Sequence, residues 1–201
     1  MTPVSESGAE VSIAREDQTS RHLPRFRAFA WRVVALHMVT YFLAGIVAFF
    51  ALDYRAVFES GPMSGFLRPI DSIWIPIGPS LQWVRGLLFA VVLYPIADSF
   101  LFKKNGWLIL WGLFVGLAIL GTCAAPGGSL EGVIYTRLSL KAHLFGLPEI
   151  MSQTLLFSLG LVAWCRRPAR WMNVLGIIAV VLIVLMSGLG ALAAAGLSRN
   201  P

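Results

Sequence analysis

Five apolar runs constrain the fold of this chain more than any other feature of its sequence. Each run is close to the ~20 residues that a helix needs to cross a lipid bilayer. Because lipid offers the backbone no hydrogen-bond partner, each run must be a helix. The sequence therefore predicts an all-α integral membrane protein, a bundle of about five transmembrane helices. The expected spans are residues 33–52, 81–102, 107–125, 144–165 and 172–197.

Composition supports the same class and excludes others. Hydrophobic residues make up 57% of the chain and charged residues 13%, whereas about a quarter of the residues in a soluble domain are charged. The formal net charge is +6, but the basic residues stand at the ends of the apolar runs. This placement argues against a nucleic-acid partner, which requires a basic patch. The two cysteines lack the spacing of a metal or redox motif, so no metal and no cofactor are expected.

The positions of Lys and Arg predict the orientation, since cytoplasmic loops are enriched in both. With five spans, one side of the membrane holds most of the basic residues, and that side is predicted to be cytoplasmic. These residues are Arg15, Arg21, Arg25, Arg27, Arg32, Lys103, Lys104, Arg166, Arg167 and Arg170. The N-terminus is thus expected in the cytoplasm and the C-terminus outside. An excess of Arg over Lys, with abundant Ala, Gly and Leu, points to a bacterial chain and to the cytoplasmic (inner) membrane.

The chain divides into a tail and one membrane domain. Residues 1–27 are polar and mixed in charge, which predicts a disordered cytoplasmic tail, and residues 28–201 form a single transmembrane domain. Two loops, 53–80 and 127–143, are longer than a hairpin needs, and we expect them to form a cap over the outer helix ends. Within the second loop, residues 133–141 alternate between polar and apolar, a period typical of an extended segment.

Charged and amide side chains near the outer ends of two spans suggest a polar cluster. Arg85 enters the second span and Glu149 begins the fourth, and isolated charges at such depths are unfavourable. We expect these two residues to pair, with Gln82 and Gln153 completing the cluster. Glu131, in the second loop, is the competing partner for Arg85.

A second polar pair is expected at the inner side. His37 is four residues into the first predicted span, and Asp98 is four residues from the end of the second. They would therefore lie at similar depth, either as a hydrogen-bonded packing pair or as a proton relay. Pro95 predicts a kink in the second span. In the third span, Gly112 and Gly116 have a GxxxG spacing, which predicts close contact with a neighbouring helix.

Three classes of function remain open. The first is an accessory or regulatory protein that binds another membrane or extracytoplasmic component through its outer cap; its partners would be membrane lipid, another membrane protein or a second copy of itself. The second is a small-solute or proton-coupled carrier that uses the intramembrane polar residues. The third is a membrane enzyme with an outer-face site at Glu131, His143 and Glu149. No catalytic motif is present, and the accessory class is favoured.

Overall fold

A computed structural model describes residues 23–52, 54–60, 65, 67–123 and 126–197. Within these residues every regular element is a helix, as predicted. The elements are α2 (Phe26–Ala51), α3 (Tyr54–Ser60), α4 (Trp74–Leu93), η1 (Tyr94–Ile96), α5 (Asp98–Leu101), α6 (Gly106–Leu113), η2 (Phe114–Leu120), α7 (Leu130–Tyr135), α8 (Leu140–Phe145), α9 (Leu147–Arg166) and α10 (Arg170–Leu197). η1 is a 3-10 turn and η2 is a π-helix.

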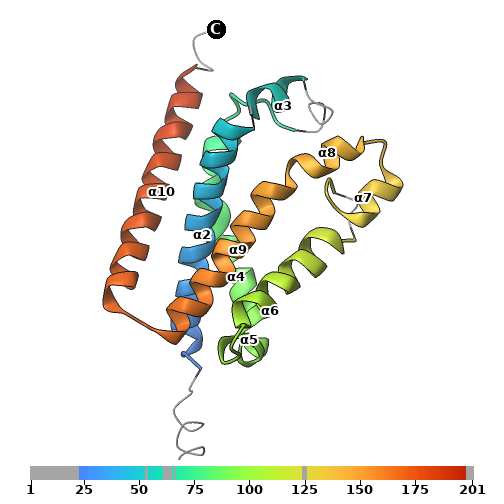
Figure 1. The fold of residues 1–201 in the computed structure, drawn as a ribbon. Coiled ribbons are helices and arrows are strands. Elements are labelled where there is room, and N and C mark those ends of the chain that lie inside the picture. The colour runs from blue at the N-terminus through green and yellow to red at the C-terminus, as the bar shows by residue number, and fades with distance from the viewer. Residues whose placement is uncertain (1–22, 53, 61–64, 66, 124–125, 198–201) are drawn as a thin grey trace, which may run out of the picture.

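Four helices are long and apolar enough to cross a bilayer. They are Phe26–Ala51, Trp74–Ile96, Leu140–Arg166 and Arg170–Gly196. The predicted third span, 107–125, is a shorter apolar helix, Gly106–Leu120. Figure 1 shows that α2, α4, α6, α9 and α10 alternate in direction. It places α3, α7 and α8 at one end of the bundle, the α3 end, and α5 at the other, the α5 end.

Two helices begin well before the apolar runs that predicted them. α2 starts at Phe26 and α4 starts at Trp74, seven residues ahead of the predicted starts in each case. The α2 start also assigns the last residues of the predicted 1–27 tail to a helix, whereas residues 1–22 lie outside the described part of the chain. In α4, Pro76 and Pro79 lie in the first two turns, where few intrahelical N–H bonds are lost. The earlier starts set the depth of the polar residues described below.

The α-helix is interrupted at Pro95, where the sequence predicts a kink. α4 ends at Leu93, and the 3-10 turn η1 carries Pro95 before the chain resumes helical geometry in α5. Proline lacks an N–H donor and its ring clashes with the preceding turn, so beyond the first turns of a helix it kinks or breaks the α-helical geometry. The break turns the chain at the α5 end and leads it into α6.

The apolar core lies toward the α5 end. α2 packs against α4, α9 and α10, and α6 packs against α9. Buried apolar side chains from α2, α4, α5, α6, η2 and α9 form one cluster. Its fully buried members include Phe29, Val33, Phe100, Leu101, Leu110 and Leu161. Much of the remaining apolar surface, such as that of Leu185 and Leu189 on α10, faces outward, as expected for side chains in contact with lipid.

Close helix contacts occur at glycines other than the predicted pair. A Cβ on Gly86 would lie 2.9 Å from the Val34 Cα, so α2 and α4 approach each other closely there. A Cβ on Gly112 or Gly116 would meet no atom within 4 Å in the described chain. The predicted GxxxG contact is therefore not made within this chain, because these glycines face away from its other helices.

The loop predicted to be extended is mostly helical. Residues 133–141 span the end of α7 and the start of α8, and only residues 136–139 between them are non-helical. Ser129 caps α7 by accepting a hydrogen bond from the Gly132 N–H, and Ser139 caps α8 by accepting one from Ala142. These serine caps satisfy N–H groups that would otherwise be unpaired, and so allow two short helices where hydropathy alternates.

Candidate functional site

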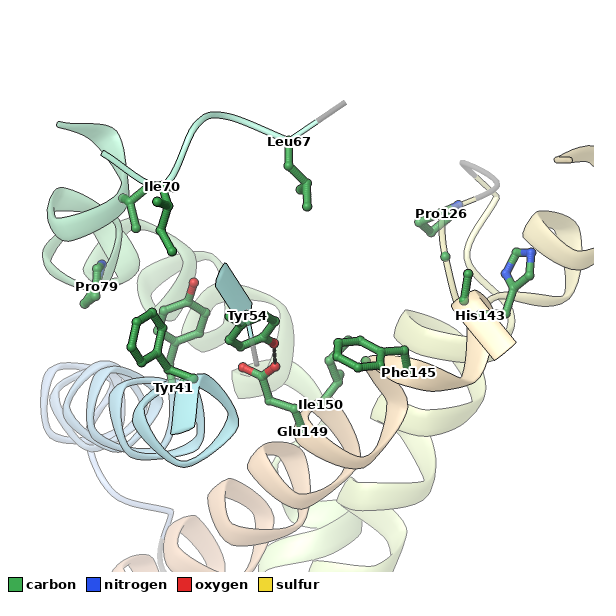
Figure 2. Close-up of a pocket in the computed structure, with 16 residues that line it drawn as sticks. Tyr41, Tyr54, Leu67, Ile70, Pro79, Pro126, His143, Phe145, Glu149 and Ile150 are labelled. Atoms are coloured by element: carbon green, nitrogen blue, oxygen red, sulfur yellow. Dashed lines mark hydrogen bonds between the residues drawn. The ribbon is translucent and has the colours of Figure 1, made fainter. Parts of the chain in front are cut away.

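A cavity with a mostly apolar wall opens at the α3 end. This cap cavity has a volume of about 530 Å³ and is bounded by α2, α9, the α8–α9 turn and the segment before α4. In Figure 2, Tyr54 and Ile150 lie beside Glu149, whereas Pro126 and His143 lie on the far side of the hollow. The lining residues are Tyr41, Gly45, Phe49, Tyr54, Leu67, Ile70, Ile75, Pro79, Pro126, Gly127, Ala142, His143, Phe145, Gly146, Glu149 and Ile150. An apolar hollow with a few polar groups is typical of a small-molecule site.

A hydrogen bond between Tyr54 and Glu149 crosses the cap cavity. The Tyr54 hydroxyl, on α3, donates to a carboxylate oxygen of Glu149, on α9 (Figure 2). Glu149 follows Pro148 in the first turn of α9, where the helix dipole stabilises a negative charge. Burial raises the pKa of Tyr54, and the bond to Glu149 raises it further, so the phenol keeps its proton above the pH at which tyrosine ordinarily ionises. The bond ties the short helix α3 to the bundle.

Four aromatic residues line the cavity that holds the Glu149 carboxylate. Tyr41 and Phe49 come from α2, Tyr54 from α3 and Phe145 from α8. The rings of Tyr54 and Phe145 meet edge to face with centroids 6.4 Å apart. The cap cavity thus combines one carboxylate with several π faces.

A groove between α2 and α9 shares Glu149 with the cap cavity. This α2–α9 groove has a volume of about 360 Å³. Its lining is almost wholly aliphatic: Leu43, Ala44, Val47, Ala48, Ala51, Leu52, Pro148, Glu149, Ser152 and Leu156. It extends from Glu149 along the two helices toward the middle of the bundle.

A smaller pocket, the central pocket, lies deeper in the bundle and has a volume of about 210 Å³. Arg85, Gln153 and His37 line it, and Phe89, Phe114 and Phe157 form an aromatic cluster at its wall, with ring centroids 5.2 to 6.4 Å apart. Its lining shares Pro126, Gly127 and Ile150 with that of the cap cavity.

The structure brings some of the predicted outer cluster together. Arg85 and Gln153 line the central pocket, and Gln82 bonds to His37 beside it, with 3.2 Å between Gln82 Oε1 and His37 Nε2. Glu149 lies in the adjoining cap cavity. Glu131, on α7, lines none of the three spaces among the residues described for them.

The predicted Arg85–Glu149 ion pair is not formed. The Arg85 guanidinium lies over the Phe89 ring, 5.4 Å from its centroid, and Glu149 accepts from Tyr54 instead. Across the described residues, the ion pair recorded is Arg55–Glu59 within α3. The two residues lie at different depths in the bundle. Arg85 is eleven residues beyond the start of α4, or ~16 Å along its axis, whereas Glu149 lies in the first turn of α9.

The predicted His37–Asp98 pair is also not formed. His37 is buried near the middle of α2 and contacts Gln82 and the ring of Phe89. Asp98 is exposed at the start of α5, and no hydrogen bond or ion pair joins it to His37 among the residues that the structure describes. Because α2 starts at Phe26, His37 lies a further seven residues from its helix start than expected.

His143, which the sequence placed in a candidate enzyme site, holds the cap loop together. Its Nδ1 accepts a hydrogen bond of 3.1 Å from the Gly128 N–H, and its Nε2 lies 3.3 Å from the Thr136 Oγ1. Gly128 has φ of 89°, a conformation that favours glycine. With both ring nitrogens in hydrogen bonds, His143 fastens the loop between η2 and α8.

Two features of this end of the protein were not predicted from the sequence: the Tyr54–Glu149 hydrogen bond and the hydrogen bonds that hold the cap loop. Tyr54 carried no signal, because a single tyrosine after an apolar run has no characteristic spacing. The loop fastening had one: Ser129 and Ser139 each precede an apolar residue by one position, as N-cap residues do.

The described part of the chain contains no group of three or more His, Cys, Asp or Glu side chains placed to hold a metal ion. Comparisons with protein-family models, with curated proteins and with solved structures find no match to this chain. Its chemistry must therefore be argued from the three spaces themselves: an apolar cavity with a carboxylate, an aliphatic groove that meets it, and a polar pocket beneath.

Proposed function

We propose that this chain is an accessory or regulatory membrane protein that binds a membrane component in its cap. The cap cavity carries the proposal: its lining encloses about 530 Å³ of mostly apolar space and includes one carboxylate, that of Glu149, which is hydrogen-bonded to Tyr54. Apolar walls supply affinity by removing ligand surface from water, and a few polar groups orient the ligand. The continuity between this cavity and the α2–α9 groove favours a molecule that enters from the bilayer.

Filling the cavity tests the proposal. Gly45 lines the cap cavity, and a Cβ there would meet no atom within 4 Å. A Gly45→Phe variant should therefore fold while occupying the ligand's space. Gly112→Phe is the matched control, since Gly112 is an equally open helical glycine away from the cavity. We expect mass spectrometry of the purified protein to find a co-purified small molecule or lipid in wild type and in Gly112→Phe, and to find it depleted in Gly45→Phe. Equal content in all three would contradict the proposal.

The proposed topology has five passes, an N-terminus in the cytoplasm and a C-terminus outside a bacterial cytoplasmic membrane. The alternating direction of five helices supports it (Figure 1), as does the gathering of basic residues toward the α5 end. A reporter fused after Pro201 should then be active outside the cytoplasm, and one inserted at Asn105 should be active within it. Activity of both on the same side would contradict five passes.

A carrier for small solutes is the second candidate, because the cap cavity and the central pocket share lining residues. That continuity would lead a solute past Ile150 to Arg85 and Gln153, with the three phenylalanines as an inner gate. A Gln153→Cys variant without the two native cysteines tests this function. Labelling by a membrane-impermeant maleimide from either side, in turn, is expected of a carrier. Labelling from one side alone would exclude alternating access.

A further inference from the structure

We propose that the cap cavity and the α2–α9 groove together bind a lipid whose headgroup bears an ammonium group. The ammonium would lie at Glu149 and the hydrocarbon chain would lie in the groove. This inference rests on the proposed function, that the cap holds a membrane component, and it names the chemical class of that component.

The negative charge of Glu149 favours a cationic headgroup. Glu149 is the one Asp, Glu, Lys or Arg side chain among the described residues that line either space. Tyr54 donates one hydrogen bond to it, and no described Lys or Arg forms an ion pair with it. A carboxylate can accept several hydrogen bonds, and a half-buried negative charge in a membrane domain is unfavourable without a cation. An ammonium group of a ligand supplies both the charge and the donors.

The aromatic rings of the cap cavity favour an ammonium group as that cation. Tyr41, Phe49, Tyr54 and Phe145 line the same cavity as the carboxylate. The negative face of an aromatic ring attracts a cation, including a ligand ammonium, and aromatic cages recognise quaternary ammonium ligands in the same way. Phosphate or carboxylate headgroups without an ammonium would gain nothing from these rings and would be repelled by Glu149.

The α2–α9 groove favours a lipid as the ligand, because it runs from Glu149 in the direction that the hydrocarbon chain of a lipid takes from its headgroup. Glu149 and Pro148 lie at the α3 end of the groove, while Leu43 and Leu156 lie deeper along α2 and α9. A lipid in the leaflet at that end has its headgroup at the surface and its chain toward the bilayer centre. The aliphatic lining therefore meets the chain when the headgroup meets the carboxylate.

Lipid binding to the full chain in detergent tests the inference. The probes are a phosphatidylethanolamine, whose headgroup has an ammonium, and a phosphatidylglycerol with the same acyl chains, whose headgroup has none. Native mass spectrometry gives Kd for each. We expect wild type to bind phosphatidylethanolamine about tenfold more tightly, the equivalent of ~1.4 kcal/mol and typical of a charge-assisted contact.

Matched variants distinguish the contribution of the headgroup to binding from that of the hydrocarbon chain. Glu149→Gln should bring the ratio of the two Kd values close to one. The control Glu131→Gln should retain the preference, since Glu131 is also a first-turn carboxylate of a cap helix but lines neither space as described. Ser152→Trp, which fills the groove from an exposed position on α9, should weaken both lipids and leave their ratio unchanged.

The outcomes distinguish the two proposals. If both lipids bind equally, Gly45→Phe abolishes binding and Glu149→Gln has no effect, the ammonium inference is wrong and the proposed function stands. If neither lipid binds and Gly45→Phe leaves the co-purified material unchanged, the proposed function fails as well. A preference that survives Glu149→Gln would also overturn the assignment of the headgroup to this carboxylate.

Discussion

The α5 end of the bundle is packed with apolar side chains, whereas the α3 end is hollow and held by hydrogen bonds. Phe29, Phe100 and Leu110 have no exposed surface, while Phe49, at the rim of the cap cavity, is 46% exposed. At the α3 end the short helices are fastened by Tyr54–Glu149 and by His143. The packed core and the proposed ligand site thus lie at opposite ends, because a close-packed core has no room for a ligand.

The largest expected effect is the difference in the free energy of unfolding between alanine substitutions of two phenylalanines, one at each end of the bundle. Phe100→Ala should lower the free energy of unfolding by about 3–5 kcal/mol, since it leaves a cavity in the core. Phe49→Ala should cost less than about 1 kcal/mol, because its ring is already half exposed. Thermal or denaturant unfolding in one detergent measures both. Equal losses would contradict the contrast between a packed and a hollow end.

Two helical glycines should respond in opposite directions. Gly86→Ala would place a Cβ 2.9 Å from the Val34 Cα and push α2 from α4, at a cost of about 1–3 kcal/mol. Gly45→Ala meets open space, and alanine favours the helix by up to ~1 kcal/mol over glycine. The same unfolding measurement applies. A tolerated Gly86→Ala would show that the α2–α4 contact is looser than described.

Loss of the loop fastening should open the cap and leave the core intact. His143→Leu removes the acceptor for the Gly128 N–H and the contact with Thr136, a loss of about 1–2 kcal/mol. Hydrogen exchange should then rise about tenfold in residues 126–143 and remain unchanged in α6. Thr136→Val, which keeps the Gly128 bond, serves as the milder control. Faster exchange throughout the protein would instead make His143 part of the global fold.

The smallest effect is expected from pH. The pKa of Tyr54 is raised by burial and by Glu149, so the folded state holds the phenolic proton more tightly than the unfolded state does. This contribution is complete below the ordinary tyrosine pKa of about 10 and is lost as the pH rises above it. Tyr54→Phe should therefore show a flatter decline in stability at alkaline pH than wild type. Parallel declines would mean that Tyr54 titrates normally.

The sequence by itself determined the class of the fold. Long apolar runs in lipid can satisfy their backbone only as helices, and Pro95 predicted a kink at the place where α4 gives way to η1. Local signals also covered the caps at Ser129 and Ser139, although the alternation of residues 133–141 obscured them. Hydropathy could not place the helix ends, because α2 and α4 continue into less apolar residues.

Only the tertiary structure decided which polar groups meet. The His37–Gln82 contact joins residues 45 apart, and the Tyr54–Glu149 bond joins residues 95 apart. Periodicity and hydropathy are local properties, whereas the axial shift and rotation of each helix depend on side-chain packing, such as that of Gly86 against Val34. A shift of two turns moved His37 away from Asp98 and Arg85 away from Glu149. The carboxylate was left in the cap with Tyr54, where a ligand can reach it.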